Sequence, residues 1–232
     1  MERLHLFVGS DPRESVGLHV FLESLWKHTS IPVDLTVLTP KLGEQLGIKS
    51  DGTNSFSKLR FVCPYLSGFK GFSLFLDGAD MLLRTDLAEL WALRDTHLAL
   101  QCVKHSYKTK FPRKYVGTTL EAENQDYPRK QWSSVILWNN GYSPHQKLTP
   151  EFISKTPGPD LHRFSWVPDD RIGELPKEWN HIPGEIQANP NAKLVHFSLG
   201  IPGFEHYRRN EHSPEWTEHL RSAAKGLQYL GK

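Results

Sequence analysis

Two aspartates close together follow an apolar run in Phe75–Met81, and their type and spacing suggest a metal site. Asp77 and Asp80 are separated by Gly78 and Ala79. Carboxylates at the end of a buried strand need a cation or hydrogen-bond donors beside them, because an unpaired buried charge is costly. Oxygen ligands of this kind suit Mg²⁺ or Mn²⁺ bound to the phosphates of a substrate. The other interpretation is a solvated turn, in which Asp77 acts as a cap and Asp80 forms an Asx turn.

A histidine ends a second short apolar run later in the chain. His196 lies in Leu194–Phe197 and is followed by a turn that contains Gly200. Its imidazole is either a third ligand of the same cation or a hydrogen-bonded residue of the core.

Two further sets of charged residues are candidates for a site. Asp169 and Asp170 are adjacent, which suits either site carboxylates or the N-cap of a helix. Arg13, Lys58 and Arg60 lie near the starts of predicted helices, where they face either phosphate oxygens or solvent.

Common nucleotide, hydrolase and zinc motifs are missing from the sequence. It contains no GxGxxG, Walker P-loop, GxSxG or CxxC pattern. This argues against the usual dinucleotide-binding, ATPase, hydrolase and zinc-ribbon functions.

Composition narrows the class of protein. The 232 residues include 28 basic and 26 acidic side chains, a formal net charge of +2, so no broad basic field for nucleic acid is expected. No apolar run approaches the roughly 20 residues of a membrane span, and the first residues lack a signal-peptide pattern. We therefore expect a cytoplasmic protein without a membrane span, in which Cys63 and Cys102 are reduced core thiols.

The elements that must position these residues begin with a strand, a helix and a strand. Leu4–Val8 and Val33–Leu38 are apolar or β-branched runs that predict parallel strands. Between them, Pro12 marks a helix start with Asp11 or Ser10 as N-cap. The helix then carries an apolar stripe of Leu18, Phe21, Leu22 and Leu25.

The rest of the chain predicts a mixed α/β domain. We expect a short helical piece within 39–57, a helix over 58–66, strands over 72–76, 81–83, 97–103, 134–138 and 193–197, a short helix from 85, and a closing helix over 214–230. The basic, irregular insertion 104–132 is expected to border the binding cleft with Lys104, His105, Lys108, Lys110 and Arg113.

Taken in order, several segments resemble GT-A nucleotide-sugar glycosyltransferases, close to the retaining enzymes of family 8 and their phage and bacterial relatives. The resemblance extends from about residue 4 to 210. The matching segments are Phe7–Glu14, Ser57–Arg60, Phe75–Leu82, Asp86–Leu90, Pro128–Ser134, Asp169–Gly173, Leu175–Asn180 and His196–Gly200.

The resemblance implies a single GT-A domain over 1–232, with a central mixed, mostly parallel sheet flanked by helices. Residues 1–103 would form a Rossmann-like half that binds the nucleotide-sugar, and residues 104–232 the acceptor side. The implied metal ligands are Asp77, Asp80 and His196, and the implied catalytic acids are Asp169 and Asp170. The implied nucleotide-sugar contacts are Ser10, Asp11, Arg13, Lys58, Arg60, Asp77, Gly78, Ala79, Ser133, Ser134 and Gly200.

One departure from the family concerns the acidic motif, which is one residue longer than the usual Asp-x-Asp. Asp77 reaches the metal only if the backbone bulges, which Gly78 permits. Otherwise Asp77 binds ribose or reaches the metal through water.

The expected function is a glycosyltransferase that depends on Mn²⁺ or Mg²⁺. It would move a hexose from a UDP-sugar such as UDP-glucose to a glycan, lipid or protein acceptor, with retention. A retaining transfer on one face needs no strong protein nucleophile, which agrees with the lack of a nucleophile motif. The alternatives are a metal-dependent nucleotidyl or phosphoryl transferase and a non-catalytic carbohydrate-binding domain.

Overall fold

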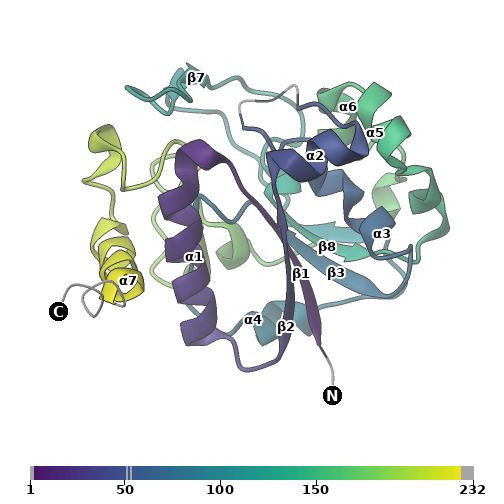
Figure 1. Cartoon of the computed structure of the whole chain (residues 1–232), viewed down its shortest axis with the longest axis horizontal. Coiled ribbons are helices and arrows are strands. Elements are labelled where there is room, and N and C mark those ends of the chain that lie inside the picture. The colour runs from purple at the N-terminus through teal and green to yellow at the C-terminus, as the bar shows by residue number, and fades with distance from the viewer. Residues whose placement is uncertain (1–2, 51, 53, 226–232) are drawn as a thin grey trace.

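The N-terminal strand–helix–strand unit forms as the sequence predicts. In the computed structural model, which describes residues 3–50, 52 and 54–225, β1 (Leu4–Gly9) leads through the 3-10 turn η1 (Pro12–Glu14) into α1 (Ser15–His28) (Figure 1). β2 (Val33–Leu38) then pairs with β1 in parallel. The side chain of Asp11 accepts a hydrogen bond from the backbone of Arg13, which starts this turn.

A six-stranded sheet crosses the fold in the order β2-β1-β3-β8-β5-β9. Its other strands are β3 (Phe72–Leu76), β8 (Val135–Asn139), β5 (Leu100–Cys102) and β9 (Ile172–Glu174). β8 is antiparallel to both of its neighbours, and the remaining pairings are parallel. The sheet is therefore mixed and mostly parallel, as expected. β9 has only three residues and was not predicted.

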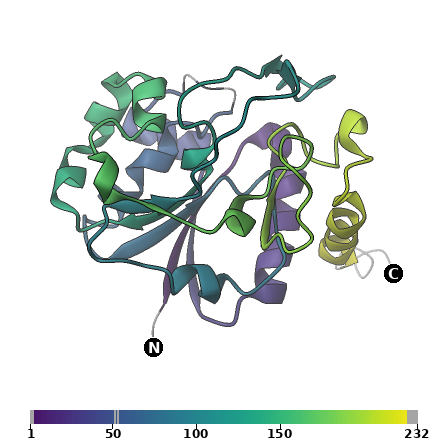
Figure 2. The ribbon, with the colours of Figure 1, turned by 180° about the vertical axis from the view of Figure 1, so that it is seen from behind.

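Helices cover both faces of this sheet. α2 (Pro40–Leu46), α3 (Cys63–Leu66), α5 (Pro150–Lys155) and α6 (Gly158–His162) lie on one face (Figure 1). α1 and α4 (Leu87–Trp91) lie on the other, and α7 (Ser213–Ala224) packs outside α1, as Figure 2 shows from behind. The predicted closing helix extends to 230, but residues 226–232 lie outside the described residues.

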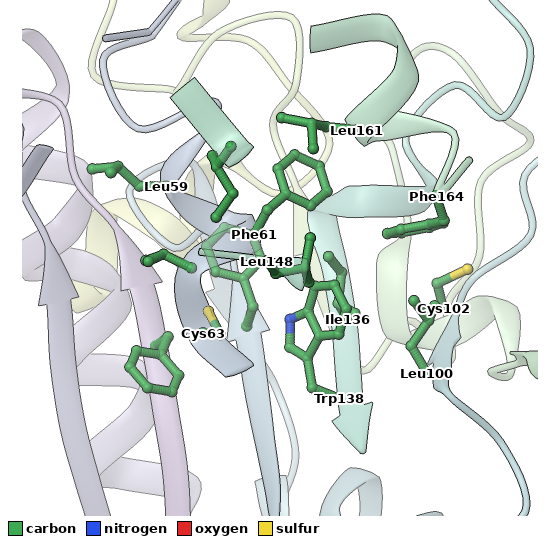
Figure 3. Packing of buried hydrophobic residues seen from close by; sticks show 14 of the residues in the cluster. Leu59, Phe61, Cys63, Leu100, Cys102, Ile136, Trp138, Leu148, Leu161 and Phe164 are labelled. Atoms are coloured by element: carbon green, nitrogen blue, oxygen red, sulfur yellow. The ribbon is translucent and has the colours of Figure 1, made fainter. Parts of the chain in front are cut away.

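Successive side chains of β1 point to opposite faces of the sheet and pack into two separate hydrophobic cores. Leu4, Leu6 and Val8 pack with α1 and α4, whereas Phe7 packs with the helices of the opposite face. Figure 3 shows the core that contains Phe7, on the face covered by α2, α3, α5 and α6. There Trp138 and Ile136 of β8 pack with Phe61 and Phe164.

Both cysteines belong to this core. Cys63 and Cys102 are buried and free, in agreement with the sequence prediction of unpaired core thiols. Within the described residues, no helix is both long and apolar enough to cross a membrane.

A second, two-stranded sheet holds the residues around His196. β4 (Met81–Leu83) and β10 (Leu194–His196) are antiparallel, and His196 lies opposite Met81. From the sequence, His196 is a candidate ligand of the same cation as Asp77 and Asp80. The structure brings them together because β4 leaves the main sheet after the acidic turn and pairs with β10.

Some elements differ from the prediction. The helix expected over 58–66 is a 3-10 turn, η2 (Leu59–Val62), followed by α3, because Pro64 has no N–H to continue the helical hydrogen bonds. The strand expected over 97–103 is shortened to β5. Within 104–132, β6 (Arg113–Lys114) and β7 (Ala122–Glu123) pair with each other.

The connections also contain further 3-10 turns. These are η3 (Trp132–Ser134), η4 (Ser143–Lys147), η5 (Asp169–Arg171), η6 (Lys177–Asn180) and η7 (Glu205–Tyr207).

Candidate active site

A pocket of about 370 Å³ lies beyond the carboxyl end of β3. Ligands of open α/β sheets bind at this end of the strands, and small-molecule pockets commonly measure about 300–1,000 Å³. Of the residues predicted for the site, the following line the pocket: Arg60, Asp77, Asp80, Ser133 and His196. The volume suits a ligand the size of a nucleotide or an activated sugar.

A tight turn after β3 aims both aspartates into the pocket. Gly78 has a φ of +72°, and the N–H of Ala79 donates to the carbonyl of Asp77 at 2.9 Å. A Cβ atom at Gly78 would lie 2.1 Å from Cγ1 of Val8, so this bend requires glycine. The extra residue of the acidic motif is therefore accommodated by a backbone bend at Gly78.

Helix α1 packs directly against this turn. A Cβ atom at Gly17 would lie 1.9 Å from the carbonyl oxygen of Ala79, so a side chain there would push the helix away. The carbonyl of Asp80 in turn accepts a hydrogen bond from the N–H of Phe197 at 2.8 Å, just after β10. The acidic turn is thus held between α1 and the strand that carries His196.

His196 faces both aspartates through one ring nitrogen. Its Nε2 lies 3.2 Å from Oδ2 of Asp80 and 3.7 Å from Oδ2 of Asp77. Its Nδ1 lies 3.0 Å from Oδ1 of Asn180, whose amide Nδ2 donates to the carbonyl of Gln131. Because an amide oxygen only accepts, Nδ1 carries a ring proton. Without a metal, Nε2 also carries a proton and donates to Asp80, and despite burial the charge and hydrogen bond of Asp80 raise the pKa of His196. A metal ion would replace the proton on Nε2.

Arg60 compensates part of the acidic charge. Its Nη1 lies 2.8 Å from Oδ1 of Asp77 and donates to the carbonyl of Ser133, and its Nε donates to the carbonyl of Ser57. Burial raises the pKa of Asp77 to about 6, against the opposing charge of Arg60. Burial also disfavours the charged form of Asp80, but the charge and hydrogen bond of His196 outweigh it and lower the pKa of Asp80.

The donor set fits a divalent cation. One carboxylate oxygen from each of Asp77 and Asp80 and one ring nitrogen of His196 all lie within 4.8 Å of one another. The other oxygen of Asp80, Oδ1, is buried without a hydrogen-bond partner among the described residues. Two carboxylates and an imidazole that gives up its Nε2 proton on binding suit Mn²⁺, and also Mg²⁺ with ligand oxygens completing the shell.

The insertion 104–132 borders the pocket, as expected, but through other residues than those named. Lys114, Tyr115, Gln125, Tyr127 and Gln131 line it. None of the five basic residues singled out from the sequence is among the lining residues. Two of them contact other parts of the protein instead. Arg113 pairs with Glu121 within the insertion, and Lys110 donates to the carbonyl of Gly184.

Lys114 and Tyr115 are pocket-lining residues that the sequence did not identify. The hydroxyl of Tyr115 donates to Oδ2 of Asp80 at 3.4 Å, and its backbone has a φ of +56°. Burial lowers the pKa of Lys114, while the charges of Asp80 and Asp77 oppose this shift. The basic and Tyr-rich composition of the insertion indicated a binding segment but not which of its residues face the pocket. The pairing of β6 with β7 decides that.

Glu14 is a third buried acid near the turn. Both of its carboxyl oxygens are buried without a hydrogen-bond partner among the described residues. Burial, together with the charges of Asp80, Asp11 and Asp77, raises the pKa of Glu14 well above its usual value and favours the protonated form. Glu14 is not a lining residue of the pocket.

The residues predicted at the first strand–helix turn, Ser10, Asp11 and Arg13, do not line the pocket but fasten a loop that does. The carboxylate of Asp11 accepts hydrogen bonds from the backbone of Ser55 at 2.8 Å and from the guanidinium of Arg13 at 2.7 and 2.8 Å. The hydroxyl of Ser55 donates to the carbonyl of Ser10 at 3.4 Å. This network fastens the loop that contributes Asn54 and its neighbours to the pocket.

Other predicted nucleotide-sugar contacts do not line the pocket. These are Lys58, Gly78, Ala79, Ser134 and Gly200. Lys58 is buried and donates to the carbonyl of Ser154, and Ser134 donates to Gln131. The ring of Tyr207 occupies the space where a side chain at Gly200 would lie.

The structure does not bring Asp169 and Asp170 into the pocket. Their side chains are 85% and 73% exposed, and they pair with Arg129 and Arg171 respectively. The reason is topological. Two antiparallel pairings give β5 and β9 the same direction as β3, so η5, which precedes β9, lies toward the start of β3 and away from Asp77.

Comparison with known proteins gives one relative in sequence. Over 225 residues the chain is 35% identical to a protein of Arabidopsis thaliana named Protein CDI, and the alignment covers 93% of this chain and 85% of that protein. No family model matches the chain.

Solved structures with a similar fold are glycosyltransferases. The bifunctional glycosyltransferase WbbM has a TM-score of 0.65 at 13% identity, covering 94% of this chain and 49% of that one. GlyE of Streptococcus pneumoniae TIGR4 has a TM-score of 0.60 at 16% identity, covering 94% and 60%. An active-site mutant of LgtC has a TM-score of 0.60 at 12% identity, covering 94% and 96%.

These similarities show that the chain has the fold of these glycosyltransferases. The chain spans about half the length of WbbM and 60% of GlyE, whereas it matches nearly the whole of LgtC.

The bend at Gly78 generates a first prediction. Gly78→Ala should lower the free energy of unfolding by about 2–4 kcal/mol, because the left-handed backbone and the overlap with Val8 both oppose a side chain. Gly47→Ala is the control, since Gly47 has a φ of +67° with open space around its Cβ position and should cost only about 1–2 kcal/mol. Urea unfolding measures both, and equal losses would contradict the packing argument.

The network around Asp11 generates a second prediction. Asp11→Asn should lower the free energy of unfolding at pH 7 by about 1–3 kcal/mol, because a buried carboxylate loses charge-assisted hydrogen bonds. Despite burial, the bonds from Arg13 and Ser55 hold the pKa of Asp11 well below its usual value. The stabilisation is thus complete above the unfolded pKa of about 3.9 and is lost as the pH falls further.

The difference in the free energy of unfolding between wild type and Asp11→Asn should therefore become smaller below about pH 4. Asp34→Asn is the matched control, because Asp34 is exposed and pairs with Arg3 at the surface, where an ion pair contributes about 0–1 kcal/mol. The comparison uses urea unfolding at pH 7 and pH 3.5. If Asp11→Asn lowers the free energy of unfolding no more than Asp34→Asn does, the hydrogen bonds of Asp11 to Ser55 and Arg13 do not stabilise the fold as proposed.

Proposed function

The chain belongs to the family of Protein CDI of Arabidopsis thaliana, and from the site it carries we propose that it is a metal-dependent glycosyltransferase using a nucleotide-sugar donor. The observation that supports this most is the convergence of Asp77, Asp80 and His196 in a pocket at the end of β3. The glycosyltransferase fold makes that edge of the sheet the expected place for a donor.

The metal would be held by this chain's own three side chains. Asp77, Asp80 and His196 would bind Mn²⁺ or Mg²⁺, which when bound would neutralise the negative charge that develops on a departing diphosphate. Asn180 holds the imidazole in the tautomer that offers Nε2. Tyr115 holds Asp80 through its hydroxyl group.

Two cations would help to bind the diphosphate. Arg60 and Lys114 both line the pocket that Asp77 and Asp80 face. Burial lowers the pKa of Lys114, so a neighbouring phosphate would favour its charged form, as the two aspartates already do. Arg60 is fixed by backbone carbonyls on both sides, which presets its guanidinium for an anion without further loss of side-chain freedom.

The finer assignment rests on the resemblance to family 8 enzymes. We propose a UDP-hexose donor such as UDP-glucose, transfer with retention, and a glycan, lipid or protein as acceptor. Retention by displacement on one face of the sugar needs no strong protein nucleophile. This agrees with the surface position of Asp169 and Asp170, outside the pocket.

The arrangement favours glycosyl transfer over nucleotidyl transfer. A nucleotidyl transferase with two metal ions would need a third carboxylate that reaches the ligands. Glu14 is the nearby acid, but it is fully buried and does not line the pocket. Burial also favours its protonated form by raising the pKa of Glu14.

The proposal predicts nucleotide binding that depends on the metal and on Asp80. UDP should raise the Tm of the wild-type protein when Mn²⁺ is present and not in its absence, because a ligand bound only to the native state stabilises it. Release of UDP from a panel of UDP-sugars should fall at least about 100-fold in Asp80→Asn, since this change removes a ligand charge without removing bulk.

Other variants sharpen the test. His196→Ala should weaken Mn²⁺ binding more than it lowers Tm, and Asp77→Asn should lie between wild type and Asp80→Asn if Asp77 acts through ribose or water. Asp170→Asn is the charge-matched control, because its side chain is 73% exposed, and it should retain turnover. Metal dependence like that of wild type in Asp80→Asn would refute the proposal, and stabilisation by glycans alone would favour a carbohydrate-binding domain.

A further inference from the structure

A second cluster of potential metal ligands lies outside the pocket. It consists of His181, directly after η6, and of Glu211 and His212, directly before α7. None of these three residues lines the pocket. The cluster joins two segments that are 30 residues apart in sequence.

The spacing of the ligand atoms suits a small tetrahedral ion. Nε2 of His181 lies 3.0 Å from Oε1 of Glu211, and Nε2 of His212 lies 3.6 Å from the same oxygen. All three ligand atoms lie within 4.8 Å of one another. A tetrahedral zinc ion with bonds of about 2.1 Å separates neighbouring ligand atoms by roughly 3.4 Å, so small side-chain adjustments would complete the geometry.

One ring nitrogen of His212 faces a carboxylate, and the other has no hydrogen-bond partner among the described residues. Its Nδ1 faces Oε2 of Glu215 at 3.9 Å, and Arg84 binds the same carboxylate at 2.9 Å. A carboxylate behind a ring nitrogen is the usual support of a metal-binding histidine, because it fixes the proton on the far side of the ring.

On the other side of the ring, Nε2 of His212 faces the carboxylate of Glu211 at 3.6 Å. This Nε2 atom is buried and has no hydrogen-bond partner among the described residues. A buried ring nitrogen and a carboxylate that face each other without a hydrogen bond are a place where a cation would stabilise both.

His181 is fully buried and directs its Nε2 into the same space. Within the described part of the chain, the contact with Glu211 is the polar contact of its ring, and its Nδ1 is buried without a partner.

We propose that His181, Glu211 and His212 form a structural Zn²⁺ site. Two imidazoles and one carboxylate are a common zinc donor set. The fourth position would be open to water or another ligand, because Glu211 is 40% exposed at the side chain. This site is separate from the proposed Mn²⁺ or Mg²⁺ site and does not depend on the proposed transferase activity.

The zinc ion would fasten the start of α7 to the strand that carries His196. The N–H of His196 donates to the carbonyl of His181 at 2.7 Å, and the N–H of His181 donates to the carbonyl of Leu194 at 2.9 Å. A bond from His181 to the metal would therefore hold β10 in place along the edge that does not pair with β4. The expected consequence is a higher Tm with zinc bound.

The experiment uses Co²⁺ as a spectroscopic substitute for zinc in metal-stripped, full-length protein. It is done in the Asp80→Asn variant, so that metal binding in the pocket is suppressed. One equivalent of Co²⁺ should bind and give the visible absorption of a four-coordinate site. Zn²⁺ should displace it and raise Tm by several degrees.

Variants of the cluster should remove this signal. Adding Glu211→Gln or His212→Asn should weaken Co²⁺ binding at least tenfold, whereas adding His206→Ala, an exposed histidine in the nearby η7, should leave it unchanged. The Tm of each metal-free protein checks that the variants fold. Because the measurement needs no nucleotide-sugar, failure of the transferase proposal leaves this test intact.

Two results would overturn the proposal. One is a lack of Co²⁺ binding in the Asp80→Asn protein, which would mean that His181, Glu211 and His212 form hydrogen bonds with one another and bind no metal. The other is Co²⁺ binding that survives both Glu211→Gln and His212→Asn, which would place the metal elsewhere.

Discussion

The burial of two carboxylates at the carboxyl end of β3 is the constraint on which the rest of the site depends. Asp77 and Asp80 are almost fully buried, and a buried charge must be compensated. The compensation comes from η2 through Arg60 and from β10 through His196, and Tyr115 of the insertion adds a hydrogen bond. Each partner comes from a different part of the chain, so the charges are a reason for these segments to meet.

The same constraint explains the unusual backbone near the pocket. The turn between the two aspartates needs a left-handed glycine, and α1 approaches it so closely that Gly17 has no room for a side chain. The loop after α2 is fastened by Asp11, whose carboxylate is satisfied by Arg13 and Ser55. The wall of the pocket is therefore set by polar networks on one side and close packing on the other.

Much of the fold could be predicted from local patterns. The apolar runs of β1, β2, β3 and β8 and the cap before η1 are short-range signals, and the structure confirms them. The Asp77–Asp80 turn was identified as a site because charge after a buried strand is rare without a partner. β9 was missed because its residues, Ile-Gly-Glu, include one large apolar side chain and so form no apolar run, unlike the equally short β4.

By itself, the sequence determined the types of donor atom and the strands that carry them, because these depend on residues adjacent in the chain. Only the tertiary structure decided which of them meet. The antiparallel pairing of β4 with β10 places His196 opposite Met81 and beside Asp80, while the direction of β9 keeps Asp169 away from Asp77. Lys114 enters the pocket through the β6–β7 pairing. Strand direction and register are set by contacts between distant segments, which no local pattern encodes.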